Sequence, residues 1–170
     1  MKKLLTLLAL STALLLALTA CGGSQEPPQE DAAIPVVLGD TLGADLANLF
    51  LPMAVTDESA TVTSLAEGVV ADLPFETMVM PVEPGLLTGF GDVEITGFSE
   101  GVMFGPAIST IPFLGYVFQM EEGADGEAFC QTLQEYCDLR WNICTEAEEV
   151  TAVQGGNYVF FLMCPTSLEG

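Results

Sequence analysis

Apolar residues in the first half of the chain recur at helical spacing and predict two short helices. Four of them share one face of the first helix: Leu42, Leu46, Leu49 and Phe50. Asp40 or Thr41 can cap this helix at its start. We expect it to end near Phe50, because Pro52 removes a backbone donor and clashes with the preceding turn.

The second predicted helix covers Val62–Asp72 and ends before Pro74. Its apolar residues also lie at helical spacing: Val62, Leu65, Ala66 and Val69. The following stretch, Met78–Gly97, contains two prolines and several glycines, so we expect a loop there. Within this loop, Val93–Thr96 can form one short strand.

The stretch Val102–Met120 carries no charge, yet its glycines and prolines argue against a membrane-spanning helix. In its second half, large apolar residues occupy every other position: Leu114, Tyr116, Phe118 and Met120. This period of two is typical of a strand. We therefore predict two buried strands that are joined near Pro112.

A third helix is predicted over Gly126–Arg140, with Asp125 as its cap. Its expected buried residues are Phe129, Leu133, Tyr136 and Cys137. Next, Glu149–Val153 and Tyr158–Cys164 flank the turn Gln154–Asn157 and predict a β-hairpin. The last strand is apolar throughout, which favours a central position covered on both faces.

These elements predict an α+β fold. Two short helices precede an antiparallel sheet of about four strands, and the C-terminal half has the order β-β-α-β-β.

The first twenty residues have the features of an export signal. Lys2 and Lys3 precede the uncharged stretch Leu4–Ala20, and small residues stand before Cys21. The sequence Leu18-Thr19-Ala20-Cys21 resembles the bacterial lipobox. This resemblance implies that the Cys21 thiol carries a diacylglyceryl group and that the chain is cut just before it. We therefore expect a lipid-anchored protein on the extracytoplasmic face of the cell membrane.

Two alternatives to this anchor are an ordinary secretion signal with an unrelated cysteine and a retained transmembrane helix. The apolar stretch is shorter than the roughly 20 residues that span a bilayer, which counts against the second. Residues 1–20 are thus the predicted signal, residues 21–36 a tether and residues 37–170 a single domain. The Pro- and Gly-rich stretch Gly22–Pro35 reaches about 43 Å as polyproline or roughly 20 Å as a coil.

Charge excludes one class of partner. The formal net charge of the whole chain is −21, and loss of the two signal lysines changes it to −23. Arg140 is then the one remaining base, and the sequence has no histidine. Nucleic-acid binding requires basic residues that neutralise phosphates, so we exclude it. The acids either form a solvated shell or attract cations or a basic partner.

The residue types that are missing also restrict catalysis. Without histidine or a mature-chain lysine, Ser-His-Asp, Cys-His, Ser-Lys and Schiff-base chemistry cannot be assembled. We predict no catalytic residues, no cofactor and no metal ligands. A pair of carboxylates is the catalytic route left open.

Four cysteines follow the predicted lipid-attachment residue: Cys130, Cys137, Cys144 and Cys164. On one helix, Cys130 and Cys137 would stand about 10.5 Å apart, too far for a disulfide. The thiols can be buried and free, can form bridges through Cys144 or Cys164, or can serve a redox or metal site. The spacing does not choose among these.

One acidic cluster is a candidate calcium site. It comprises Glu121, Glu122, Asp125 and Glu127, but lacks the EF-hand spacing, and a polar turn before a helix explains it as well. We expect Arg140 to form an ion pair with a nearby acid, and Trp141 to belong to the core.

Several stretches together resemble a family of uncharacterised surface lipoproteins from Gram-positive gut anaerobes. They are Ala71–Phe75, Met80–Pro84, Tyr116–Asp125, Leu139–Cys144 and Gly156–Phe161, within Val62–Met163. The resemblance implies an envelope location and a domain of unknown function, and it brings no catalytic residues.

Three functional hypotheses follow. The first is a lipid-tethered, non-enzymatic surface domain that binds or scaffolds a protein or small molecule. The second is a cation-dependent surface module, and the third is a carboxylate hydrolase.

Overall fold

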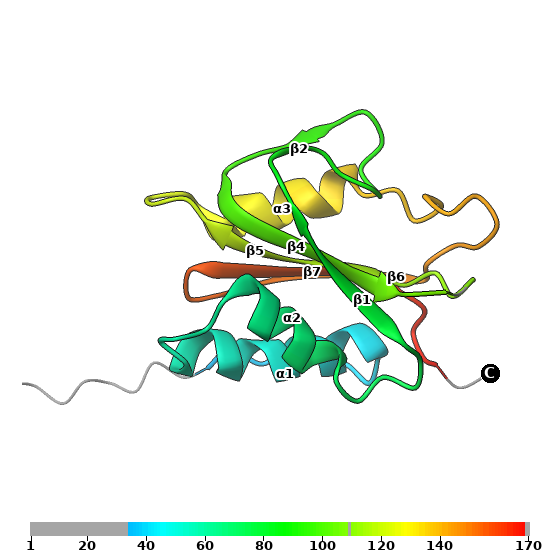
Figure 1. The fold of residues 1–170 in the computed structure, drawn as a ribbon, viewed down its shortest axis with the longest axis horizontal. Helices are drawn as coiled ribbons and strands as arrows, with labels where there is room; N and C mark the ends of the chain where they lie inside the picture. The colour runs from blue at the N-terminus through cyan, green and yellow to red at the C-terminus, as the bar shows by residue number, and fades with distance from the viewer. Residues whose placement is uncertain (1–33, 109, 169–170) are drawn as a thin grey trace, which may run out of the picture. The chain divides into compact units, whose positions relative to one another are not determined.

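One antiparallel sheet organises the part of the chain that the computed structural model describes, residues 34–108 and 110–168 (Figure 1). Its five strands lie in the order β1 (Thr77–Val82), β4 (Phe98–Pro106), β5 (Leu114–Met120), β7 (Tyr158–Cys164) and β6 (Glu149–Gly155). A separate two-stranded sheet pairs β2 (Gly85–Leu86) with β3 (Glu94–Ile95). The predicted signal, Cys21 and most of the predicted tether lie outside the described residues.

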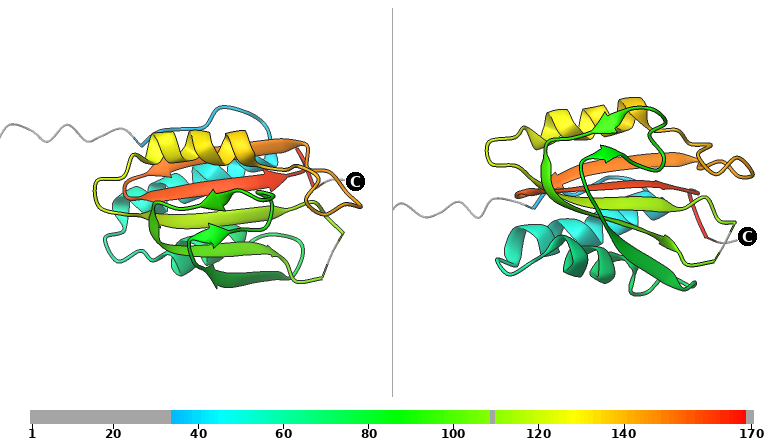
Figure 2. Two further views of the ribbon diagram at one scale, coloured as in Figure 1. Left: turned by 90° about the horizontal axis from the view of Figure 1, so that it is seen from above. Right: turned by 45° about the horizontal axis from the view of Figure 1, so that its top comes forward.

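The sheet separates two apolar cores (Figure 2). Helices α1 (Leu42–Thr56) and α2 (Val62–Val70) cover one face, and α3 (Gly126–Tyr136) with the β2–β3 segment covers the other. The α1-side core includes Phe50, Leu65, Phe104, Val117 and Phe160. The α3-side core includes Phe90, Tyr116, Phe118, Phe129 and Phe161.

Alternation along the inner strands supplies both cores. In β7, Val159, Phe161 and Met163 face α3, whereas Phe160 and Leu162 face α1. All are fully buried, because β5 and β6 flank this strand and helices cover it on both sides. The predicted hairpin, the interior position of its second strand and the α+β class are confirmed.

The first helix continues beyond its predicted end. It includes Pro52 and ends at Thr56, because Leu51 and Ala54 are buried against the sheet. This burial compensates for the backbone hydrogen bond that proline cannot donate. Thr41 is the N-cap, as one of the two predicted alternatives. Leu49 was expected on the buried face and is instead exposed.

The prediction of a loop from Met78 to Gly97 is partly wrong. Strand β1 lies in it, paired with β4 in the register Pro81↔Val102. A proline is tolerated there because β1 is an edge strand, where one side of the backbone needs no partner. The short strand expected at Val93–Thr96 is β3.

Helix α3 is shorter than predicted and ends at Tyr136 rather than Arg140. The Asp138 N–H donates to the Gly89 carbonyl at 2.7 Å, and the Asp138 carboxylate accepts from the Arg140 N–H at 2.9 Å. These bonds turn the chain away from the helix axis. Tyr136, expected in the core, is exposed, and Cys137 is half-buried.

Gly115 provides a test of core packing. A methyl group at this position would collide with the Phe104 ring, which stacks on Phe160 with centroids 6.0 Å apart. We expect Gly115→Ala to lower the free energy of unfolding by about 1–3 kcal/mol, measured by urea denaturation. The control is Gly68→Ala in α2, where the neighbour is the flexible Met53 side chain and stability should be kept or rise. Equal stability of Gly115→Ala and the parent chain would contradict this packing.

Candidate functional site

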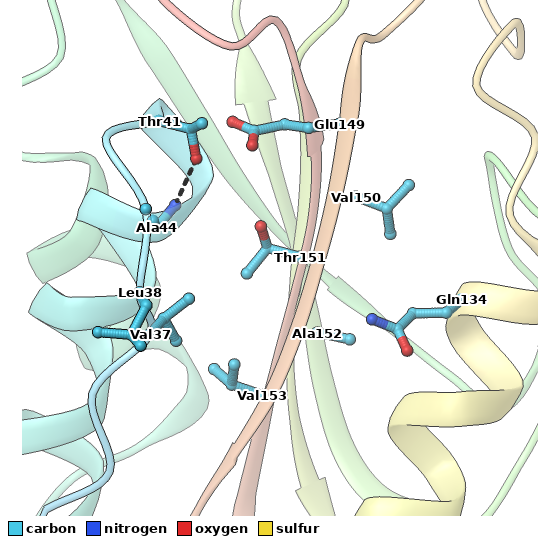
Figure 3. Close-up of a pocket in the computed structure, with 11 residues that line it drawn as sticks. Val37, Leu38, Thr41, Ala44, Gln134, Glu149, Val150, Thr151, Ala152 and Val153 are labelled. Atoms are coloured by element: carbon cyan, nitrogen blue, oxygen red, sulfur yellow. Dashed lines mark hydrogen bonds between the residues drawn. The ribbon is translucent and has the colours of Figure 1, made fainter.

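The outer edge of β6 lies in a groove of about 370 Å³. We call it the edge groove, and define it by Val37, Leu38, Gly39, Thr41, Ala44, Gln134 and Glu149–Val153. Figure 3 shows that Thr151 and Val153 point toward α1, while Val150 and Ala152 point toward Gln134 on α3. The backbone edge of the strand therefore runs along the groove between its α1 side and its α3 side.

The hairpin register decides which backbone groups of β6 face the groove. Gly155 pairs with Tyr158 across a two-residue turn, so these two form a hydrogen-bonded pair. Counting back in steps of two, Val153 and Thr151 also bond to β7. The N–H and C=O groups of Val150, Ala152 and Gln154 then point outward. Within residues 34–108 and 110–168, no backbone hydrogen bond joins them to another segment.

An extended segment runs beside this edge without pairing to it. The Asn48 side chain accepts from the Val37 N–H at 2.9 Å and donates to the Val37 carbonyl at 3.0 Å. Both backbone groups of Val37 are thereby held by α1. The segment Ile34–Gly39 consequently does not become a sixth strand, and its residues Val37–Gly39 line the edge groove.

The wall on the α1 side carries the apolar side chains Val37, Leu38 and Val153 together with Thr41, Thr151 and Glu149. Leu38 is 92% exposed and Val36 is 69% exposed, while Val37 packs against the α1-side core. A large apolar side chain such as Leu38, in water beside an unpaired strand edge, is a feature of surfaces that bind another chain.

On the α3 side, the apolar Val150 and Ala152 of β6 lie beside a polar stripe of α3. Gln134 lines the groove, and helical spacing places Gln131 and Glu127 on the same stripe one and two turns earlier. Glu135 is exposed next to Gln134. The helix runs alongside β6, since a methyl group at Gly126 would contact the Gln154 side chain.

The helix terminus at one end of the groove has no free donors. The Leu42 N–H donates to the Thr166 carbonyl at 2.9 Å, and the Gly43 N–H donates to Glu149 Oε1 at 2.7 Å. The Ala44 N–H donates to Thr41 Oγ1 at 3.3 Å. Because these donors are occupied, the start of α1 does not offer an anion site.

Hydrogen bonds join the residue before β6 to the segment after β7. Thr166 donates through its N–H and hydroxyl to Glu148 Oε2 at 2.9 and 2.7 Å, and these bonds hold the pKa of Glu148 below its usual range. The contact is therefore made above the ordinary glutamate pKa and is lost as the pH falls through the lowered value. This arrangement fixes β6 beside α1 at neutral pH.

The four cysteines are free thiols in the structure. Cys130 and Cys164 are buried in different cores on opposite sides of the sheet, so they cannot be joined. Burial raises the pKa of Cys130 to about 11, and burial beside Glu149 raises that of Cys164. Cys144 is exposed, unlike the buried thiols that the sequence suggested.

The predicted acidic cluster forms a polar turn. Asp125 caps α3 by accepting from the Ala128 N–H at 3.0 Å, and the Ala124 N–H donates to the Glu121 carbonyl. Glu121, Glu122 and Glu127 are exposed. In the described part of the chain, no group of three or more histidine, cysteine or acidic side chains is arranged to hold a metal ion.

Arg140 pairs with Glu146 at 3.7 Å, with both side chains mostly in water, so this predicted ion pair adds little stability. Trp141 is half-buried against the α3-side core.

Sequence reasoning missed the edge groove, since neither Leu38 nor Asn48 belongs to a recognisable motif.

Two further hollows are each lined by a pair of glutamates. Glu67 and Glu76 line one, and Glu83 and Glu100 line the other. All four residues are exposed. A glycosidase-type general acid needs apolar, water-poor surroundings, whereas these four side chains are in water.

Comparisons with protein-family models, with curated proteins and with solved structures each found no match. Of the helices in the described residues, none has the length and hydrophobicity needed to cross a membrane.

Amide hydrogen exchange tests the open edge. We expect the amides of Val150, Ala152 and Gln154 to exchange about 100-fold or more faster than those of Thr151 and Val153, which bond to β7. The measurement is residue-resolved exchange by NMR at neutral pH. Equal protection of both sets would contradict an unpaired outer edge.

Thiol labelling tests the cysteine environments. At pH 8, the exposed Cys144 should react first and the half-buried Cys137 more slowly, while Cys130 and Cys164 remain protonated and shielded. Denaturation without reductant should release all four thiols. Recovery of fewer than four would reveal a disulfide.

Stability should fall as the pH rises from about 9 toward 11, because the unfolded thiols ionise first.

Proposed function

We propose that this chain is a lipid-anchored extracytoplasmic domain that binds a partner at the outer edge of β6 and performs no catalysis. The observation that carries the proposal is the unpaired edge from Val150 to Gln154, set between the segment Val37–Gly39 and α3. Such an edge binds extended segments through main-chain hydrogen bonds, while the walls select side chains.

The contrast between the two edges of the sheet supports this choice. At the β1 edge, Pro81 interrupts the row of backbone donors, which is a common way of protecting an edge. Strand β6 contains neither proline nor lysine, and Val150–Val153 are uncharged residues. The β6 edge is thus the one suited to strand addition.

The anchor in this proposal rests on the sequence of residues 1–21, with two or more acyl chains providing durable attachment. The segment Val37–Gly39, which follows the predicted tether in the sequence and precedes α1, lines the edge groove. Binding would therefore take place close to the point where the tether joins the domain.

Cys21→Ala tests the anchor. We expect this variant to move from the membrane fraction to the soluble fraction of the producing cells, because no acyl chain can be attached. Cys144→Ala, which alters an exposed cysteine elsewhere, should stay with the membrane. Mass spectrometry of the native N-terminus should find a diacylglyceryl group on Cys21. Membrane retention of Cys21→Ala would contradict the proposal.

A further inference from the structure

The structure assigns a partner class to the edge groove: we infer that it takes an extended cationic segment in which basic and apolar residues alternate. This inference rests on the proposed function, since it names the ligand of the same β6 edge.

Backbone geometry sets the form and length of the segment. The groups available for hydrogen bonding belong to every second residue, namely Val150, Ala152 and Gln154. Only an extended chain matches this spacing, and about five of its residues would cover the three positions.

The walls set the alternation. Successive side chains of an added strand point to opposite faces of the sheet. One set would lie against Val37, Leu38 and Val153, where apolar side chains would fit. The other set would lie over Val150 and Ala152 and extend toward the α3 stripe of Gln134, Gln131 and Glu127. Long basic side chains would cover the two apolar residues with their aliphatic stems and donate hydrogen bonds to the stripe.

The negative charge around the edge groove determines that the partner segment is positively charged. Asp40, Glu149 and Glu135 stand at or next to residues that line the edge groove. The mature chain has Arg140 as its single base, and its formal net charge is −23 once two lysines leave a chain of −21. A second copy of this chain would bring the same charge to the edge, so self-pairing is disfavoured and a basic partner is attracted.

The test uses the mature chain, residues 21–170 with Cys21→Ala, and a blocked peptide of sequence KVKTKVK. We expect saturable binding by calorimetry that weakens as salt is added. Amide exchange at Val150, Ala152 and Gln154 should slow on binding. The matched peptide EVETEVE should bind at least about tenfold more weakly.

Two variants locate the binding. Ala152→Pro removes an outward N–H that the β6–β7 ladder does not use, so the chain should fold and lose at least about tenfold in affinity. Cys144→Ala, at an exposed position outside the edge groove, should bind like the parent. Because Leu38 is 92% exposed, the pair Leu38→Lys and Leu38→Glu should both fold. The lysine variant should bind KVKTKVK more weakly than the glutamate variant.

Each contrary outcome shows which part of the inference is wrong. No slowing of exchange at the three amides with either peptide would overturn strand addition. Slowing with EVETEVE as strong as with KVKTKVK would overturn the cationic class while leaving the edge as the binding element. Protection that rises with protein concentration in the absence of peptide would identify a second copy as the occupant. None of these results depends on the lipid anchor, which the Cys21→Ala fractionation tests separately.

Discussion

Two hydrogen bonds from the Asn48 side chain to the Val37 backbone decide where the sheet ends. An extended segment beside an open strand edge would ordinarily complete the ladder, because unpaired backbone groups gain stability from any extended neighbour. Asn48 satisfies both polar groups of Val37 from the helix side. The segment is therefore committed to α1, and β6 remains the last strand. The edge groove and its row of outward backbone groups both follow from this choice.

The rest of the described surface offers few other positions at which a partner could bind. Both faces of the sheet are covered, one by α1 and α2 and the other by α3 with β2 and β3. Pro81 interrupts the opposite edge, and the first donors of α1 are occupied by Thr166, Glu149 and Thr41. The Glu-lined hollows are open to water. Binding at the β6 edge is consequently the function that the arrangement of the described residues supports best.

Local signals in the sequence predicted most of the helices and strands but not the edge groove. Alternation predicted β5, and an apolar run after a turn predicted β7. The caps, Asp40 or Thr41 for α1 and Asp125 for α3, marked helix starts. Pro52 and Pro81 misled because burial and an edge position, both tertiary properties, compensate for a missing N–H. The groove could not be predicted for the same reason. Whether β6 is an edge strand depends on the strand order, and its wall depends on a contact between residues 37 and 48 that no short motif encodes.

The acidic excess, which by itself indicates only a solvated surface, has a specific consequence beside an open edge. An unprotected strand edge invites pairing between identical copies, and many proteins prevent this with proline or lysine on the strand. Strand β6 has neither, yet every copy of the domain carries a large negative charge. Like-charge repulsion can keep copies apart while the same field draws in a basic strand. On this reasoning the charge both protects the edge and selects its partner, so the edge can stay open without a steric guard.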